Sequence, residues 1–132
     1  MNLSNNRLYR HLSNNSSFYL ENLPNNHIRK SLTKLRLGSH YFMIERGRWR
    51  NLELVDRICF KCNEVEDEYH VVMCCSKYKD LRTKYLPKEL FNRPSMFKSI
   101  EFINCENIRH LRNLGLFVYN VFKQYEKDEI YE

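Results

Sequence analysis

Cysteine and histidine residues in the middle of the chain follow the spacing Cys-x2-Cys-x7-His, and two adjacent cysteines stand behind the histidine: Cys59, Cys62, His70, Cys74 and Cys75. Two residues between the first pair form a tight turn that aims both sulfurs at one point. A histidine and a third thiolate from a following element complete a tetrahedron, the arrangement that zinc prefers. Three thiolates and a neutral imidazole leave no open coordination position. The spacing therefore predicts a structural Zn2+ site without a catalytic role.

The fourth zinc ligand is open between the two adjacent cysteines. On an uninterrupted α-helix Cys74 lies at i+4 from His70, on the same face, whereas Cys75 lies about 140° around the helix axis. Cys75 can bind only if His70 stands in or before the first helical turn, with distorted backbone between them. Helix geometry alone favours Cys74. The remaining cysteine, Cys105, is predicted to be an ordinary buried thiol.

The length and composition indicate one small, mostly α-helical domain. The chain has 132 residues, of which 42% are hydrophobic, with only three Gly and three Pro. These values are typical of a globular chain with few tight hairpins. Five cysteines form no disulfide framework, and no apolar run is long enough to span a membrane. We expect an intracellular protein, in the cytoplasm or nucleus, with a loose segment over residues 1–17 and a single zinc-binding helical domain over residues 18–132.

Apolar spacing and breakers place the helices around the cysteine motif. Asp67 is a suitable N-cap and Pro87 a suitable stop for a helix that carries His70, while a strand or loop over residues 51–62 leads into the first cysteine pair. Pro94 suits the first position of a later helix. The predicted helices cover residues 28–37 up to Gly38, 39–46 up to Gly47, 68–86, a segment from Pro94 to Ile103, and 106–127.

Charge is unevenly distributed along the chain. Residues 1–52 carry a balance of +7 and residues 71–98 a balance of +5, whereas residues 53–70 carry −4 and residues 99–132 carry −2. Basic stretches suit polyanions such as nucleic acid, although a solvated helix surface gives the same pattern. The net charge of +6 thus comes from two basic stretches on either side of an acidic one.

Three runs of the sequence together resemble the segment that follows the polymerase domain in LINE-type non-LTR retrotransposon reverse transcriptases. They are residues 32–40 (LTKLRLGSH), residues 45–49 (ERGRW) and the run of cysteines and histidine from Cys59 to Cys75. That family carries a CCHC motif of the form Cys-x2-Cys-x7-His-x4-Cys. It also tends to have Glu-Asp before the histidine, here Glu66-Asp67, and an arginine after the last cysteine, here Arg82.

The resemblance implies a ligand set and a function. Its zinc ligands are Cys59, Cys62, His70 and Cys75, with Cys74 as a neighbour or alternative ligand. In that family the segment is thought to hold RNA or DNA near the polymerase, so we expect salt-dependent binding with weak sequence specificity. The predicted phosphate contacts are Lys30, Lys34, Arg36, Arg46, Arg48, Arg50, Lys77 and Arg82, with Arg29, Lys79 and Lys84 beside them.

Two further residues have two interpretations each. Trp49, between Arg48 and Arg50, either stacks on an unpaired base or packs in the core, and the core is favoured because large aromatics are mostly buried. His40 either hydrogen-bonds a residue of the zinc site or is a satisfied polar residue near Gly38, and the second is favoured. We do not expect His40 to be a zinc ligand.

The sequence carries no signature of a catalytic site. It has no Tyr-x-Asp-Asp motif and no acidic cluster of an endonuclease, so we expect a non-enzymatic module derived from such a polyprotein, without polymerase activity of its own. The alternative is a zinc-stabilised structural or protein-interaction domain. A C-terminal apolar stripe at helical spacing fits a core or a partner helix: Ile108, Leu111, Leu114, Val118, Val121, Phe122 and Tyr125.

Overall fold

The computed structural model describes residues 17–130, which are mostly helical, as predicted. The α-helices are α1 (Ser17–Asn22), α2 (Asn26–Leu37), α3 (Met43–Trp49), α4 (Lys79–Tyr85), α5 (Lys88–Asn92), α6 (Met96–Ile103) and α7 (Ile108–Ile130). The other elements are the 3-10 helices η3 (Leu54–Asp56) and η5 (Ser76–Tyr78), the π-helix η4 (His70–Cys74), and the strands β1 (Ile58–Cys59) and β2 (Glu64–Val65). The predicted loose segment 1–17 lies outside the described residues, except for Ser17, which begins α1.

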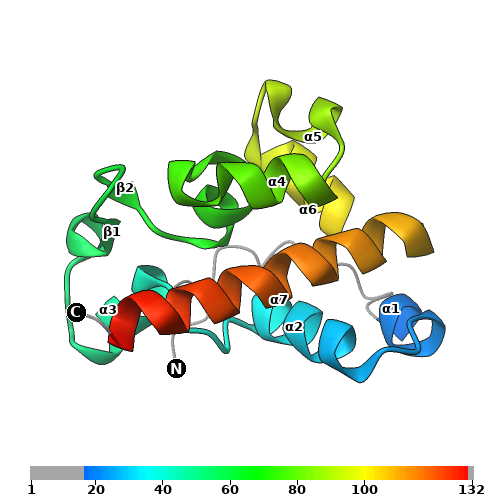
Figure 1. Ribbon diagram of the computed structural model, residues 1–132. Coiled ribbons are helices and arrows are strands. Elements are labelled where there is room, and N and C mark those ends of the chain that lie inside the picture. The colour runs from blue at the N-terminus through cyan, green and yellow to red at the C-terminus, as the bar shows by residue number, and fades with distance from the viewer. Residues whose placement is uncertain (1–16, 131–132) are drawn as a thin grey trace.

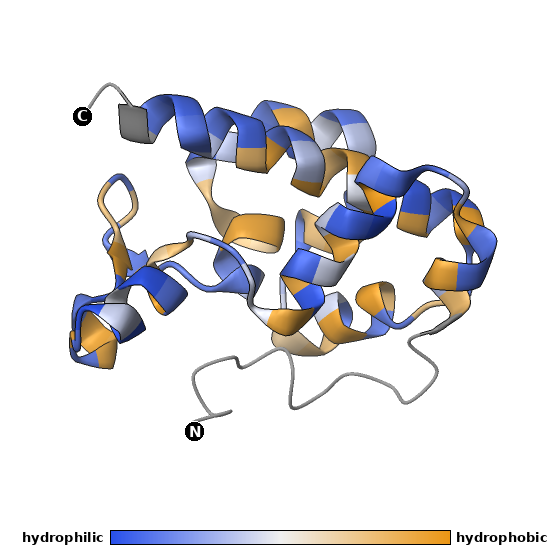
Figure 2. Cartoon of the chain, turned by 90° about the horizontal axis from the view of Figure 1, so that it is seen from below, coloured by the Kyte–Doolittle hydropathy of each residue, from blue (hydrophilic) through white to orange (hydrophobic). Residues whose placement is uncertain are grey.

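Helix α7 is the centre of the fold. It lies between α2 and α4, and both helices contact it (Figure 1). Polar and apolar residues alternate along α7 (Figure 2), and most of its predicted stripe is buried, from Leu111 to Tyr125, while Ile108 at the first turn is exposed. The chain's own helices therefore cover this stripe. None of the described helices, including the 23-residue α7, is long and apolar enough to cross a membrane.

The packing of α2 on α7 depends on one close approach. A Cβ on Gly115 of α7 would lie 2.3 Å from Cγ2 of Ile28 on α2, so only glycine fits there. The bounds of α2 agree with the prediction. Asn25 caps its first turn by accepting from the amides of His27 and Ile28 at 2.9 and 3.1 Å. Gly38 ends it in the left-handed region at φ 72°.

The prediction for the next helix is wrong in its bounds. We expected residues 39–46 with a break at Gly47, but α3 runs from Met43 to Trp49 and Gly47 lies inside it. The glycine serves packing and not termination, because a Cβ at Gly47 would lie 2.3 Å from Cγ of Arg57. The Arg57 stem fills that space and its Nε donates to the Leu52 carbonyl at 3.0 Å.

The continuous helix predicted over residues 68–86 is also wrong. The chain forms a π-helix, leaves helical geometry at Cys75 (φ −60°, ψ 125°), and resumes through η5 into α4. Helix α6 begins at Met96 and not at Pro94, because the Ser95 side chain caps it by accepting from the Lys98 amide at 3.1 Å. The last helix is confirmed, with bounds shifted to residues 108–130.

Candidate metal centre

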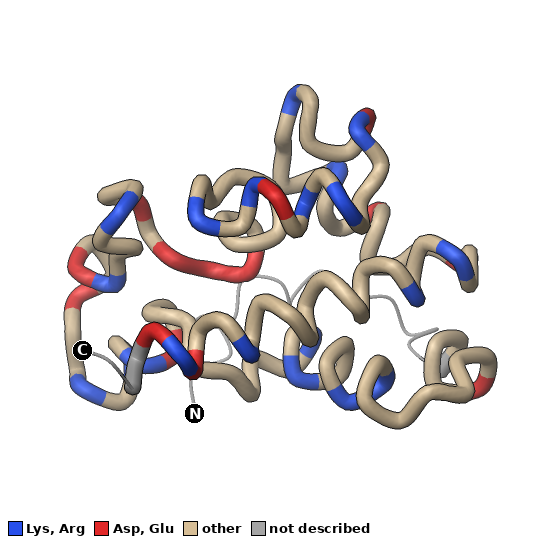
Figure 3. Tube along the Cα trace, in the orientation of Figure 1, with Lys and Arg blue, Asp and Glu red and all other residues tan. Residues whose placement is uncertain are grey.

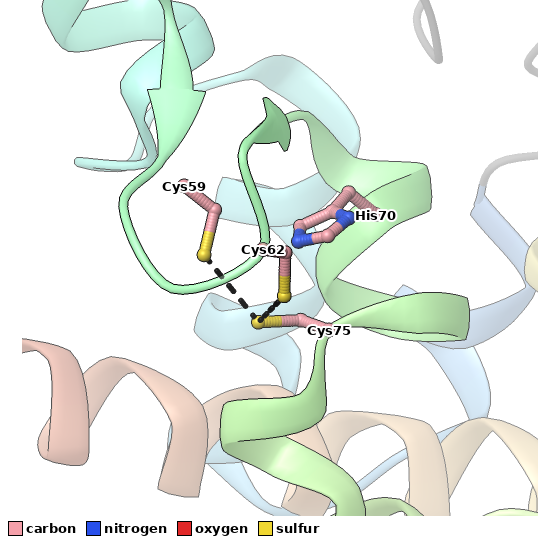
Figure 4. Close-up of side chains that lie close together, drawn as sticks. All are labelled: Cys59, Cys62, His70 and Cys75. Carbon is pink, nitrogen blue, oxygen red and sulfur yellow. Dashed lines mark hydrogen bonds between the residues drawn. The ribbon is translucent and has the colours of Figure 1, made fainter.

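The hairpin of β1 and β2 carries the first two cysteines. The strands pair antiparallel, with Cys59 opposite Glu64, which confirms a short strand before the cysteine pair. Asn63 turns the chain at φ 57°, a conformation that asparagine tolerates better than most residues. Its amide donates to the Cys59 carbonyl at 2.7 Å. This turn directs the sulfurs of Cys59 and Cys62 toward Cys75 (Figure 4).

Four side chains from three separate elements converge beside this turn. Cys59 ends β1, Cys62 lies in the turn, His70 begins η4 and Cys75 follows it (Figure 4). The ligand atoms of these four residues all lie within 4.8 Å of one another. The Cys75 sulfur lies 3.8 Å from the Cys59 sulfur and 4.0 Å from the Cys62 sulfur. The four predicted ligands thus form a cluster that could hold a metal ion.

The chemistry of the cluster fits a tetrahedral ion. Zinc–sulfur bonds of roughly 2.3 Å give tetrahedral edges of roughly 3.8 Å between sulfurs, close to the two distances found. Both ring nitrogens of His70 are buried and make no hydrogen bond within the described residues. The nearest recorded carboxylate oxygen, Oε2 of Glu64, is 3.5 Å from Nδ1. A buried imidazole without partners is costly unless an ion binds it.

The π-helix explains why Cys75 and not Cys74 joins the cluster. The Cys75 amide donates to the His70 carbonyl at 2.7 Å, which is an i+5 hydrogen bond. A π turn holds one residue more than an α turn, so position i+5 returns to the face of His70. Our helix argument for Cys74 assumed 3.6 residues per turn and fails here.

Cys74 belongs to a different environment. Its thiol is half-buried and hydrogen-bonded to the side chain of Tyr69, and burial raises its pKa. Cys105 is also half-buried and packs against the core, with a pKa raised by burial. Neither sulfur is part of the four-residue cluster.

Burial controls the protonation of two ligands in the metal-free fold. It lowers the pKa of His70, so the imidazole is neutral near pH 7 and ready to bind an ion. It raises the pKa of Cys75 to about 12, since a thiolate there would lose its hydration. Metal binding must therefore release the Cys75 proton.

Arg82 supports the backbone at the end of the π-helix. It was predicted to contact phosphate, but this is wrong, because the residue is only 4% exposed. Its Nε donates to the Val72 carbonyl at 2.7 Å, and its Nη2 donates to the carbonyls of Val71 and Cys75 at 2.9 Å. These acceptors are left without helical partners where η4 ends. The buried guanidinium thus holds Cys75 in position, and its charge opposes the negative charge of nearby thiolates.

The acidic run before His70 is buried, which the sequence did not indicate (Figure 3). Asp67 acts as the predicted cap, since its Oδ1 accepts from the His70 amide at 2.8 Å. Glu68 Oε2 lies 2.5 Å from Nε2 of His40, so His40 is the satisfied polar residue that we favoured. These contacts connect the metal segment to the chain that follows α2.

Glu66 connects the same segment to α3 and α7. Its Oε1 accepts from the Met43 amide at 2.8 Å and from the Tyr125 hydroxyl at 2.7 Å. The Tyr125 hydroxyl in turn accepts from Nη2 of Arg46 at 2.8 Å. Burial and the Glu66 carboxylate raise the pKa of Tyr125, so its hydroxyl stays protonated and donates. The metal segment is thereby fixed to both ends of the helical core.

The predicted phosphate contacts divide by exposure. Arg36 is a second wrong prediction, because it is 4% exposed, donates to the Ile103 carbonyl at 3.0 Å and lies over the Tyr19 ring. Arg46 and Lys77 are half-buried. The remaining four are exposed on α2 or near the end of α3: Lys30, Lys34, Arg48 and Arg50. Exposed lysines and arginines are present on elements on both sides of α7 (Figure 3).

The two basic stretches of the sequence meet at one aromatic ring. Arg46 Cζ lies 5.3 Å from the centroid of Tyr125, and Lys77 Nζ lies 5.5 Å from it. A pocket beside this ring is also lined by Lys61 of the cysteine turn. The sequence analysis missed Lys61 because it stands alone in an acidic stretch. It missed Tyr125 because the residue fits an apolar stripe.

Trp49 is on the surface, so the core interpretation is wrong. It is 52% exposed and meets the 60% exposed Tyr41 edge-on, with ring centroids 6.0 Å apart. The buried residues of α3 are on other positions, including Met43 and Ile44. Two aromatic rings are therefore presented to solvent next to the exposed side chains of Arg48 and Arg50.

Comparison with known proteins adds no relative. No protein-family model, curated protein or solved structure matches the chain. The resemblance to the retrotransposon segment therefore stays a prediction.

Proposed function

We propose that this chain is a zinc-stabilised nucleic-acid-binding module, derived from the C-terminal region of a non-LTR retrotransposon reverse transcriptase and without polymerase activity of its own. The observation that carries the proposal is the meeting of Arg46 and Lys77 at Tyr125. It brings cations from two separate basic stretches to one place, as a polyanion site requires.

Zinc is the ion that best suits the cluster. Three thiolates and an imidazole are ligands that it prefers, and sulfur spacings of 3.8 and 4.0 Å suit its tetrahedral geometry. All four positions would be filled by the protein, so the ion stabilises the fold and has no site for a substrate. The proposed role of zinc is therefore to hold the cysteine turn against α3 and α7.

The exposed aromatic pair supports the nucleic-acid proposal. Trp49 and Tyr41 offer faces and edges on which an unpaired base can stack, and Arg48 and Arg50 stand beside them. Arg48 is ion-paired with Glu45 at 2.9 Å, which orients its guanidinium. Aromatic rings with neighbouring cations are typical of surfaces that bind single strands.

The alternative of a protein-interaction domain has less support. It relied on the apolar stripe of α7 being open to a partner helix. From Leu111 to Tyr125 that stripe is mostly buried under the chain's own helices.

The test measures binding of short single- and double-stranded RNA and DNA by the zinc-loaded chain at two salt concentrations. We expect affinity to fall steeply with salt, because bound phosphates release counterions. The double variant Arg48→Gln/Arg50→Gln should weaken binding and flatten the salt dependence by up to about two contacts. The double variant Lys88→Gln/Arg93→Gln removes the same charge from exposed sites near α5 and is the matched control.

Removing zinc with a chelator should abolish the binding, because the cysteine turn then loses its position. Binding that is absent, or that is indifferent to salt in the zinc-loaded protein, would contradict the proposed function.

A further inference from the structure

A pocket lies between the cysteine turn, α3 and the C-terminal part of α7. It has a volume of about 220 Å³ and is next to the metal cluster, since Phe60 and Lys61 between the first two cysteines form one wall. The hairpin, α3 and the end of α7 lie at the same end of the molecule (Figure 1). The volume is below the roughly 300–1,000 Å³ of sites for drug-sized molecules. It suits one unit of a polymer that continues outside the pocket.

Phe60 has no role in the core. It is 74% exposed, although full burial of such a side chain stabilises a fold by roughly 1.5–3 kcal/mol. The metal ligands on either side fix its backbone, so the ring is held in place while its face stays open. A fixed, open aromatic face is what a nucleobase needs for stacking.

The charges of the pocket favour an anion. Arg46, Lys61 and Lys77 line it, against the carboxylates of Glu66 and Asp128. Three cations and two carboxylates leave a surplus of one positive charge, the complement of one phosphodiester. Glu66 is also committed to the Met43 amide and the Tyr125 hydroxyl, which disperses its charge. The two cations over the Tyr125 ring are held in place, and Lys61 is exposed at the rim.

We infer that this pocket binds one nucleotide unit of a single strand, with the base stacked on Phe60 and its phosphate contacted by Lys61 and Lys77. A duplex cannot use the site in this way, because its bases are stacked on one another inside the helix. The inference rests on the proposed function and adds to it a preference for unpaired nucleic acid.

The experiment compares Phe60→Ala and Phe97→Ala in the full, zinc-loaded chain. Phe97 is 73% exposed on α6, so it is a matched control for the loss of a surface phenylalanine. The probes are a fluorescently labelled homopolymeric single strand of about ten nucleotides and the duplex of the same length. Phe60→Ala should weaken single-strand binding at least about fivefold and leave duplex binding unchanged, whereas Phe97→Ala should change neither.

Two further variants separate stacking from folding. Phe60→Trp keeps an aromatic face and should restore single-strand binding, and Lys61→Gln should weaken it and reduce its salt dependence. Zinc content, measured by native mass spectrometry, should be the same in all variants.

Equal effects of Phe60→Ala and Phe97→Ala, or an equal loss for single strand and duplex, would overturn the inference while leaving the proposed function intact. Absence of any nucleic-acid binding by the parent chain would overturn both.

Discussion

The guanidinium of Arg82 holds the carbonyl oxygen of Cys75 at 2.9 Å, and so fixes the residue that closes the metal cluster. The same side chain satisfies two more carbonyls at the end of the π-helix. A side chain that had been assigned to the surface is thus part of the scaffold of the site.

Replacement of Arg82 by lysine should destabilise the protein although the charge is kept. An ammonium group cannot reach three carbonyls in the plane of a guanidinium fork, so buried acceptors lose their donor. We expect a loss of roughly 1–3 kcal/mol in the free energy of unfolding, measured by urea denaturation of the zinc-loaded protein. Lys84→Gln, at an exposed position of the same helix, is the control. A stability equal to that of the parent would show that the three hydrogen bonds are dispensable.

Substitution of the adjacent cysteines should distinguish the fourth ligand. Cys75→Ser removes a thiolate from the cluster, and we expect the zinc-loaded species to disappear from the native mass spectrum in the presence of a competing chelator. Cys74→Ser should keep one zinc per chain, because this thiol lies against Tyr69. The reverse pattern would mean that a regular α-turn, and not the π turn, forms in solution.

Replacement of Gly115 by alanine should loosen the packing of α2 on α7. The added methyl would meet Cγ2 of Ile28 at 2.3 Å, so one of the helices must shift. We expect roughly 1–3 kcal/mol of destabilisation, as for other overpacked cores, seen as a lower melting temperature. Arg112→Ala, on an exposed position of α7, should change the melting temperature little. A Gly115→Ala protein that melts with the parent would contradict the close approach.

The pH dependence of stability should have opposite sign with and without metal. In the metal-free fold the pKa of Cys75 is raised from 9.0 to about 12. A raised folded-state pKa means that this contribution is complete below about pH 9 and is lost as the pH rises towards 12. The metal-loaded protein needs the thiolate, so zinc affinity should rise with pH.

Parallel denaturation of chelated and zinc-loaded protein across pH 6 to 10 checks both trends. Zinc affinity that is flat over this range would show that the Cys75 thiol is already ionised without the ion.

The metal ligands and most helices could be predicted from the sequence because they depend on local chemistry. The spacing from Cys59 to His70 identifies the ligands, and Asn25 and Gly38 mark the ends of α2 by their own hydrogen bonding and backbone freedom. Such signals are independent of what lies far along the chain.

The wrong predictions have a common physical cause, which is a partner distant in sequence. Gly47 continues a helix because the Arg57 stem packs against it. Arg36 is buried because the Ile103 carbonyl, 67 positions away, accepts its hydrogen bond. A basic residue that bonds a buried carbonyl looks the same in sequence as one that faces solvent. The π turn was missed because Arg82 satisfies the carbonyls that it leaves without partners.

The hydrogen bonds of Glu66 also bear on the chain entropy of metal binding. Bringing Cys59 and Cys75 together closes a loop of 16 positions, and the closure entropy of such a loop is roughly 3 kcal/mol. Because Glu66, within the loop, is bonded to α3 and α7, folding of the helices contributes to this closure. An excised peptide of residues 57–78 would have to meet the whole entropy cost from the metal–ligand bonds, and so would hold the ion less tightly than the complete chain.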